Sequence, residues 1–366
     1  MKESEKNSNN TRDIFADILR GFAILLVVWG HCIQENNGAT FSSEALFFDD
    51  KLYQFIYSFH MPLFALIAGY YAYNSIAKAD TINKRIRLLV KRITVYLIPI
   101  VFWTLEEYIR EAIIKDKYGV DRARGFAVIP DFLYRVLNNH WFLWAMIVCF
   151  VFVWIMYCFL KDNVILYACI FVSLFFIPDG MNMHTYKFLL PFYVTAFYYN
   201  QFRNNAVAAG GLLSKCKRVY EEKTPVATAI TGTVFLALFA MYRKRAFIYV
   251  SGYRITKDVW YKQFATDVYR FAIGMAGCLF FICLWSLILK AVKGYRFPVL
   301  CMFGRYSLGV YLISGYITIL GLRNFTDAFT PNDLRATLIA IPVAFAALGL
   351  AYLISLVPLL RKVVGR

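Results

Sequence analysis

The chain has few charged residues and few histidines. Asp, Glu, Lys and Arg make up 17% of its 366 residues, whereas a soluble domain carries about a quarter. Hydrophobic residues make up 60%, and they fall in long runs rather than at the spacing of a soluble core. This composition argues against a soluble enzyme and predicts an integral membrane protein.

Several sequence signals are also missing. The chain has no Walker loop, dinucleotide fingerprint, GxSxG elbow or HExxH motif. Its four histidines are scattered, and most of its eight cysteines lie in or beside apolar runs without a CxxC pair. We therefore expect no metal and no disulfide framework. The first apolar run is longer than the ~7–15 residues of a signal-peptide core, so we expect no secretory signal.

The apolar runs predict an all-α membrane protein with about ten transmembrane helices in a single bundle that encloses a cavity. We expect a polar, disordered tail over residues 1–12 and one transmembrane domain over residues 13–366. The predicted segments are about 14–33, 52–74, 86–105, 141–160, 164–178, 187–201, 225–242, 266–290, 298–320 and 335–360. The fifth and sixth are short, and we expect them to be partly enclosed by the others.

Lys and Arg are concentrated in alternate connections, above all in 75–92 and 200–224, while acidic residues favour the other set. The positive-inside rule then places both termini in the cytoplasm. The formal net charge of +17 is explained as charge at the membrane surface, where lipid headgroups are partners, and nucleic acid is not expected.

The stretch DILRGFAILLVVWGH, residues 17–31, places ionisable groups inside the first segment. Eleven residues of α-helix turn through about 1,100° and rise ~16 Å, so Arg20 and His31 share one face about half a bilayer apart. Asp17 and Glu35 extend that stripe by one turn at each end. Such a stripe is costly against lipid, which predicts a protein-lined path. Alternatively, Arg20 snorkels to the inner interface and His31 is an interfacial histidine.

Several segments resemble one family in the same order along the chain. The first segment, with its Arg-x10-His spacing, is similar to the first helix of the membrane-bound acyltransferase type 3 family. YSFHMPLFALIAGYY (57–71), KRIRLLVKRITVYLIP (84–99), HWFLWAM (140–146) and FGRYSLGVYLIS (303–314) resemble its second, third, fourth and penultimate helices. The FHMPLF form is closest to the branch of fucose 4-O-acetylase-like sugar O-acetyltransferases. Ser314 stands where that family often has a histidine.

The resemblance implies transfer of an acyl group, usually acetyl, from cytoplasmic acyl-CoA to a sugar hydroxyl on a surface polysaccharide or lipid-linked glycan. It also implies the bacterial inner membrane. A sugar hydroxyl needs a base at neutral pH, and histidine suits that task. His31 is therefore the candidate base or transient acyl carrier, with Glu35 as an orienting group.

Basic residues at the predicted cytoplasmic surface are candidates for holding the phosphates of CoA, because guanidinium binds phosphate in a bidentate manner. The candidates are Arg20, Lys84, Arg85, Lys91 and Arg92, with Lys91 and Arg92 favoured as the nearest to the membrane. The alternative is ordinary positive-inside charge that contacts anionic lipid.

Candidate acceptor-binding residues lie deeper in the chain or near the predicted outer surface. Aromatic faces stack on sugar rings, although interfacial Trp is ordinarily an anchor and a buried histidine is often only packed. The segment 243–265 is expected to be an outer lid or an interfacial helix. The candidates are Asp17, His60, His140, Trp141, Tyr253, Trp260 and Tyr261, with Asn324, Asp327 and Asp333 as weaker ones.

A secondary transporter with an Arg20–His31 ion or anion path is the main alternative, since several spans with intramembrane charge fit that class equally well. An inactive relative that only binds glycan precursors is a third reading. The sequence shows no inverted repeat, and a transporter gives no reason for the order of the acyltransferase-like motifs.

Overall fold

The computed structural model describes residues 13–36, 46–118, 125–160, 164–206, 222–254, 260–293, 295–318 and 333–366. These residues are helical almost throughout and contain no strand, which confirms the all-α prediction for the described chain. The α-helices are α1 (Ile14–Asn36), α2 (Lys51–Tyr57), α3 (His60–Ala77), α4 (Ile82–Tyr118), α5 (Val128–Asn138), α6 (Trp141–Phe159), α7 (Val164–Leu174), α8 (Met183–Ala206), α10 (Thr224–Ala240), α11 (Ile248–Ser251), α12 (Trp260–Ala291), α13 (Pro298–Arg305), α14 (Ser307–Ile317) and α16 (Asp333–Leu356). Short 3-10 turns are η1 (Leu46–Phe48), η2 (Gly125–Ala127), η3 (Lys244–Ala246) and η6 (Arg361–Val364).

Six stretches of the described chain are long and apolar enough to cross a membrane. They are Ile14–Glu35, Lys51–Ala77, Ile82–Glu111, Trp141–Phe159, Trp260–Ala291 and Asp333–Leu356, and two further apolar helices, Thr224–Ala240 and Ser307–Ile317, are shorter. All ten predicted segments contain helix, but the number of spans stays a prediction beyond these six.

Two of the predicted segments are each divided into two helices. The second breaks at Ser58 and Phe59, directly before the first turn of α3, where Pro62 sits. Proline is tolerated in a first turn because the amide it lacks has no intrahelical partner there. The ninth, predicted over 298–320 as one helix, breaks at Tyr306 between α13 and α14.

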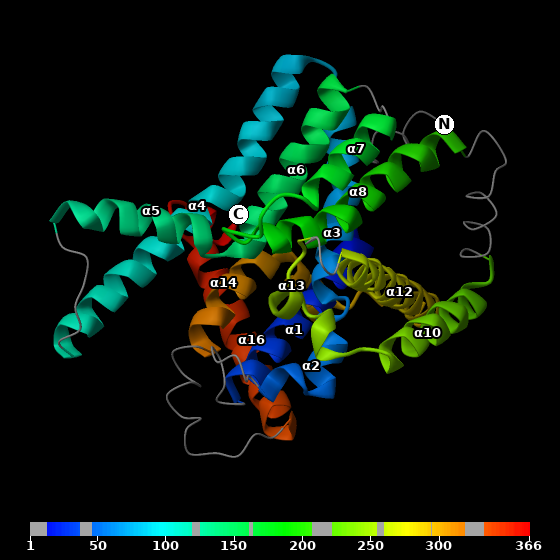
Figure 1. The fold of residues 1–366 in the computed structure, drawn as a ribbon. Helices are drawn as coiled ribbons and strands as arrows, with labels where there is room; N and C mark the ends of the chain where they lie inside the picture. Colours follow the sequence, from blue (N-terminus) through cyan, green and yellow to red (C-terminus); the bar gives the residue numbers. More distant parts are fainter. Residues whose placement is uncertain are drawn as a thin grey trace, which may run out of the picture.

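Helix α1 lies in the middle of the bundle and packs against α3, α13, α14 and α16 (Figure 1). Its contact with α13 is made backbone to backbone. A Cβ added to Gly304 would lie 1.9 Å from the Asp17 carbonyl oxygen, and one added to Gly21 would lie 2.0 Å from that of Leu300. Glycine at both positions is what allows the two helices to approach so closely.

Helices α3 and α8 form a second close crossing. A Cβ on Gly69 would lie 2.1 Å from the Tyr193 carbonyl oxygen, and the Asn200 side-chain amide donates to the Tyr70 carbonyl at 2.7 Å. This pair fixes α3 beside α1, because α3 packs on both helices.

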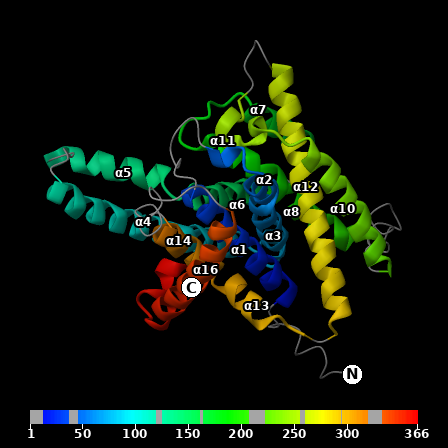
Figure 2. The same cartoon turned by 90° about the horizontal axis from the view of Figure 1, so that it is seen from below.

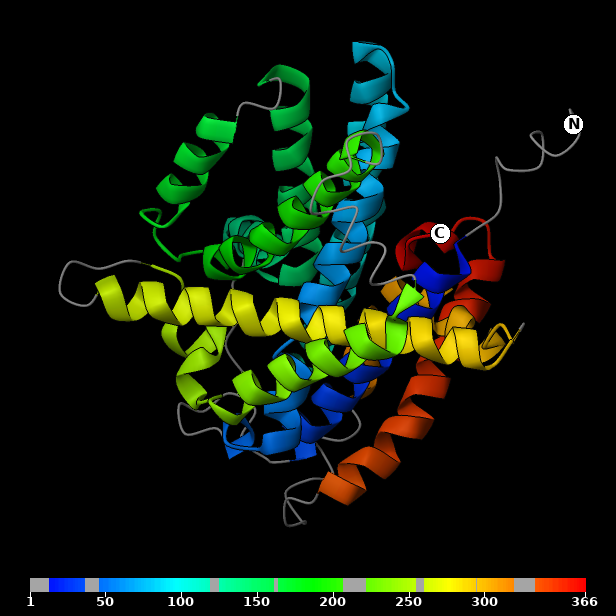
Figure 3. The same ribbon diagram turned by 90° about the vertical axis from the view of Figure 1, so that its right-hand side faces the viewer.

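The remaining helices surround this centre. The pair α10 and α12 packs along one side, and α5 lies beside the far end of α4, the two together forming an arm that projects from the opposite side (Figure 2). Figure 3 shows α12 crossing the bundle at a steep angle to α4.

Contacts between the segments that connect the helices agree with helices that cross the membrane in alternating directions. Lys290 donates to Thr224 at 2.5 Å, and both were predicted on the inner side. Lys244 pairs with Asp49 at 3.9 Å, and the Asn182 amide donates to the Asn138 carbonyl at 2.8 Å. Those four residues lie in connections predicted on the outer side. The cytoplasmic position of both termini stays a prediction.

Candidate active site

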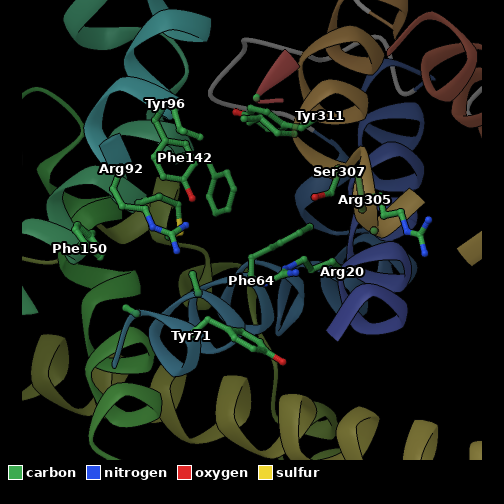
Figure 4. Close-up of a pocket in the computed structure, with 18 of the residues that line it drawn as sticks. Arg20, Phe64, Tyr71, Arg92, Tyr96, Phe142, Phe150, Arg305, Ser307 and Tyr311 are labelled. Carbon is green, nitrogen blue, oxygen red and sulfur yellow. The ribbon is translucent and has the colours of Figure 1, made fainter. Parts of the chain in front are cut away.

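A cavity of about 490 Å³ opens between α1, α3, α4, α6, α13 and α14. Figure 4 shows Arg20 from α1 and Arg92 from α4 on opposite sides of it, with both guanidinium groups directed inward. No Asp or Glu is among the described residues that line it. Its polar lining consists of Arg20, Tyr71, Ser75, Arg92, Tyr96, Tyr193, Arg305, Ser307, Tyr311 and Arg366. The cavity therefore carries a positive charge suited to an anion.

Arg20 is held in place by neighbours on both sides. The Asp17 carboxylate, 1% exposed, lies 3.6 Å from Arg20 and 3.5 Å from Arg305, so it pairs with both. The Arg20 guanidinium also lies 5.3 Å from the centre of the Tyr71 ring, and the Tyr71 hydroxyl donates to Asp13. Asp17 was predicted to bind substrate, but the structure places it behind the arginines, where it positions them.

Arg92 is the residue of the basic cluster that reaches the cavity. It donates to Ser75 Oγ at 3.1 Å and lies 6.0 Å from the centre of the Phe150 ring. Both contacts tie the start of α4 to α3 and α6. The guanidinium keeps further N–H groups available for a ligand.

The other predicted donor-binding residues lie elsewhere. Lys84 is exposed and pairs with Asp80 at 2.8 Å, and Lys91 is exposed and does not line the cavity. Arg85 donates to the Ala79 carbonyl at 2.9 Å and lies over the Tyr157 ring. Arg85 therefore joins α4 to α6 instead of facing the cavity.

The cavity runs along the face of α1 that carries Arg20 and ends before it reaches His31, which lies on the same face. Arg20, Ile24 and Val27 line it at helical spacing, and His31 is the next residue on that face, ~6 Å further along the axis. His31 itself is not among the lining residues. The open path predicted from Arg20 to His31 is thus interrupted one turn short of the imidazole.

His31 is packed among residues of α2 and α3. Tyr57 lies against Gly30, its ring centre is 4.5 Å from that of His60, and His60 lies near His31. His31 is half-buried as a residue, while its Nδ1 is buried and has no hydrogen-bond partner in the described part of the chain. A buried ring nitrogen without a partner is unusual, which marks this histidine for a role beyond packing.

His60 is fixed more firmly. It is 1% exposed, and its Nδ1 lies 2.7 Å from the Ile56 carbonyl oxygen. Because a carbonyl only accepts, Nδ1 carries the hydrogen and Nε2 is left as the acceptor of the neutral ring. Glu35 is buried one turn beyond His31, and α1 continues to Asn36, so the helix that this assignment required is present.

A second, much smaller pocket of about 30 Å³ lies on the far side of this cluster, between Tyr57, Trp141, Tyr249 and Arg270. Of the described residues, Met61 alone lines both spaces. Tyr249 is 43% exposed, and because a tyrosine hydroxyl has a pKa of about 10 it remains a donor at neutral pH.

His140 and Trp141 begin α6 beside this pocket. Trp141 lines it, with its ring centre 6.1 Å from that of Tyr249. His140 does not line it, but adopts φ 53° before the helix, and its Nε2 is buried without a hydrogen-bond partner among the described residues. Burial lowers the pKa of His140 to about 4, which keeps the ring neutral at physiological pH.

The segment predicted as an outer lid is held in place by a buried arginine. Arg270, 2% exposed, pairs with Asp267 at 2.6 Å and donates to the carbonyls of residues 245, 246, 247 and 252. Tyr253 does not present an open face, because it is 4% exposed and stacks on Phe175 at 5.1 Å. Trp260 and Tyr261 are more than half exposed at the start of α12, and neither lines the small pocket.

The structure leaves the weaker acceptor candidates away from both spaces. Asp333 begins α16 without lining either pocket, and Asn324 and Asp327 lie outside the described residues. Asp333, Tyr253 and Trp260 do not line the small pocket that Trp141 lines, so their role in binding the acceptor stays a prediction.

Comparison with known proteins identifies the family. A family model described as an acyltransferase domain matches residues 13–357. The chain belongs to the acyltransferase type 3 family. It is 34% identical over 142 residues to nodulation protein NolL of Sinorhizobium fredii, covering 38% of this chain and 36% of that protein. It is 25% identical over 194 residues to nodulation protein NolL of Mesorhizobium japonicum, covering 52% and 49%.

The matched part of the chain therefore spans less than half the length of either relative. No solved structure matches the chain. Membership of the acyltransferase family confirms the resemblance read from the sequence, and the apolar helices make this an integral membrane protein.

Several residues that line the large cavity were not predicted from the sequence. Tyr71 ends the motif YSFHMPLFALIAGYY (57–71), but nothing in that motif indicates that its ring lies over Arg20. Arg305 opens the penultimate motif, and Arg366 lies beyond the residues that the family model matches. The position of Arg305 beside Gly304 was the one available signal, since a glycine at a close helix crossing brings its neighbour near the facing helix.

Proposed function

We propose that this protein is an acyl-CoA-dependent O-acyltransferase that transfers acetyl to a sugar hydroxyl on a surface polysaccharide or lipid-linked glycan, in the bacterial inner membrane. One observation supports it above the others: an arginine-lined cavity follows the α1 face and stops one turn before a histidine with an unpartnered ring nitrogen. The family match supports acyl transfer as the reaction class.

The charge of the cavity suits the donor. CoA carries a diphosphate and a 3′-phosphate, and planar guanidinium groups bind phosphate oxygens through two parallel hydrogen bonds. Arg20 and Arg92 face each other across the space. Asp17 pairs with Arg20 but does not line the cavity, and no other Asp or Glu among the described residues lines it. The thioester end would then extend past Ile24 and Val27 toward His31 and Met61.

His31 is proposed as the general base. The sugar hydroxyl oxygen attacks the thioester carbonyl carbon as the imidazole takes the hydroxyl proton. The carbon–sulfur bond then breaks, and the imidazolium returns the proton to the departing CoA thiolate. Glu35 and His60 are proposed to hold the ring in position, and no external oxidant, metal or further cofactor enters this scheme.

The small pocket at Trp141 is proposed as the entry for the acceptor. It is much smaller than a sugar ring, so the acceptor must displace side chains that line it. Met61 lies between this pocket and the donor cavity, and its three rotatable bonds make it the side chain best suited to move. Trp141 and Tyr249 supply an aromatic face and a hydroxyl donor beside it.

The decisive experiment uses inside-out membrane vesicles supplied with acetyl-CoA labelled in the acetyl group. We expect label in glycan for the unaltered protein and at least a 100-fold loss of rate for His31→Ala, the scale of a lost general base. His184→Ala is the matched control, because His184 lines neither space and its ring contacts the Asp179 carbonyl. Undiminished labelling with His31→Ala would remove this residue from the mechanism.

The same experiment tests the transporter alternative. A transporter would leave the acetyl label on soluble product or on unreacted donor, whether or not an acceptor is present. Mass spectrometry of the host's surface glycans, with and without the protein, then identifies the acyl group and the sugar by the mass that is added.

A further inference from the structure

The last residues of the chain form part of the cavity wall. Val364, Gly365 and Arg366 line the same space as Arg20 and Arg92, although the family model matches only as far as residue 357. We propose that residues 363–366 belong to the donor site and that Arg366 binds a phosphate group of acyl-CoA. This inference rests on the proposed function, because it assigns the donor's anionic part to a particular residue.

The segment is built into the fold. The Trp103 indole of α4 donates to the Val363 carbonyl at 2.9 Å. Val363 and Val364 are 6% and 1% exposed, and Val364 packs close to Gly309 of α14. The wall is therefore held by α4 on one side and α14 on the other.

Gly365 turns the chain so that Arg366 reaches the cavity. Its φ is +74°, in the left-handed region, and a Cβ there would lie 2.3 Å from Leu308. Only glycine fits both the backbone conformation and the space. The Arg366 amide then donates to the Arg361 carbonyl at 2.9 Å, which closes the turn.

The Arg366 guanidinium is oriented and keeps its charge available. It lies 4.4 Å from the centre of the Tyr306 ring, a stacking distance that fixes its plane. Arg20 and Arg305 share the Asp17 carboxylate, whereas Arg366 forms no ion pair with an Asp or Glu in the described residues. A positioned guanidinium without a carboxylate partner, on the wall of a cavity, is suited to a phosphate.

The charge of the donor decides which part of it Arg366 would contact. Pantetheine is uncharged, so it gains nothing from a cation, while the diphosphate and 3′-phosphate carry the negative charge. Arg366 is exposed at the rim, whereas Arg20 lies further in, next to Ile24 on the cavity's apolar stretch. The phosphates therefore belong at the rim, with the pantetheine arm directed inward.

The test measures binding of CoA and of pantetheine to the purified full chain in detergent, for the unaltered protein, Arg366→Gln and Lys362→Gln. Lys362 is the matched control, since it stands in the same segment but does not line the cavity. We expect Arg366→Gln to weaken CoA binding about tenfold, the scale of a lost charge-assisted hydrogen bond. Pantetheine binding should be equal in all three proteins.

Other results would overturn the assignment. Unchanged CoA affinity with Arg366→Gln rejects the phosphate contact while the donor site stands, and equal weakening of CoA and pantetheine shows that residue 366 only shapes the wall. If the unaltered protein binds no CoA, the proposed function fails together with this inference. Should Arg366→Gln fold poorly, Tyr306→Leu removes the ring beneath the guanidinium and is expected to weaken CoA binding while pantetheine binding is unchanged.

Discussion

At the residue scale, Asp17 shows how a buried charge is tolerated inside a membrane protein. Its carboxylate is 1% exposed and lies between Arg20 at 3.6 Å and Arg305 at 3.5 Å. An isolated buried carboxylate is costly, and two cations offset that cost only while all three groups are present. The arrangement also keeps Arg20 directed at the cavity.

Asp17→Asn should therefore destabilise the protein and weaken donor binding together. Because the Arg20 and Arg305 side chains are 30% and 46% exposed, water screens part of the loss, and we expect about 1–2 kcal/mol. Thermal unfolding in detergent and the KM for acetyl-CoA measure the two effects.

Asp80→Asn provides the control. Asp80 pairs with Lys84 at 2.8 Å, but the two side chains are 67% and 60% exposed, so water screens the pair and we expect no measurable change in the thermal midpoint. Equal effects of the two substitutions would contradict the account of Asp17 as a positioning group.

The sequence predicted the position of some candidate site residues and not of others. Arg20 could be placed because the helical repeat fixes which residues share a face with it. Tyr253 could not, because an aromatic residue in a polar connection has the same sequence signature whether it stacks on a sugar or, as here, on Phe175. Lys91 and Arg92 are adjacent in the sequence, and only the packing of α4 against α3 and α6 decides that Arg92 faces inward.

At the element scale, the crossing of α1 and α13 determines where Arg20 and Arg305 lie on the cavity wall. Both helices carry a glycine at the crossing, and the backbones meet there without intervening side chains. Packing of this kind allows almost no adjustment, because a backbone carbonyl cannot move aside as a long side chain can.

Gly304→Ala should accordingly be severely destabilising, since its Cβ would lie 1.9 Å from the Asp17 carbonyl oxygen. We expect a loss of more than about 2 kcal/mol, the scale of overpacking, seen as a lower thermal midpoint in detergent. Gly315→Ala in α14 is the matched change, because no atom lies within 4 Å of the added Cβ. Alanine there should be neutral or stabilise the helix by about 0.5–1 kcal/mol.

Helix positions were largely predictable, while their interruptions were less so. Each of the ten apolar runs contains helix, since burial in lipid or protein obliges the backbone to satisfy its own hydrogen bonds. The break at Tyr306 has no proline beside it, so the run over 298–320 reads as continuous until the packing of α13 against α1 is known.

At the scale of the whole molecule, the contacts between connections divide them into two sets, one holding Lys290 and Thr224 and the other Lys244 and Asp49. The Lys and Arg distribution assigns the first set to the cytoplasm. The same prediction places the start of α4 on that side, and Arg92 of α4 lines the large cavity.

A membrane-impermeant thiol reagent tests this orientation in a cysteine-free variant that carries one introduced cysteine. We expect Lys84→Cys to be labelled in inside-out vesicles and Lys244→Cys in right-side-out vesicles, because both side chains are solvent-exposed or nearly so. The reverse pattern would place the arginine cavity on the wrong side for cytoplasmic acyl-CoA.

The backbone contact between α1 and α13 has a consequence for how a bulky donor enters. Two helices that touch at Gly21 and Gly304 must travel as a single rigid body, carrying Arg20, Asp17 and Arg305 with them. Any widening of the entrance must then come from the opposite wall, where Arg92 meets α3 and α6 through a hydroxyl and an aromatic ring. We therefore expect the α1–α13 side of the cavity to stay fixed and the α4 side to move when a ligand enters.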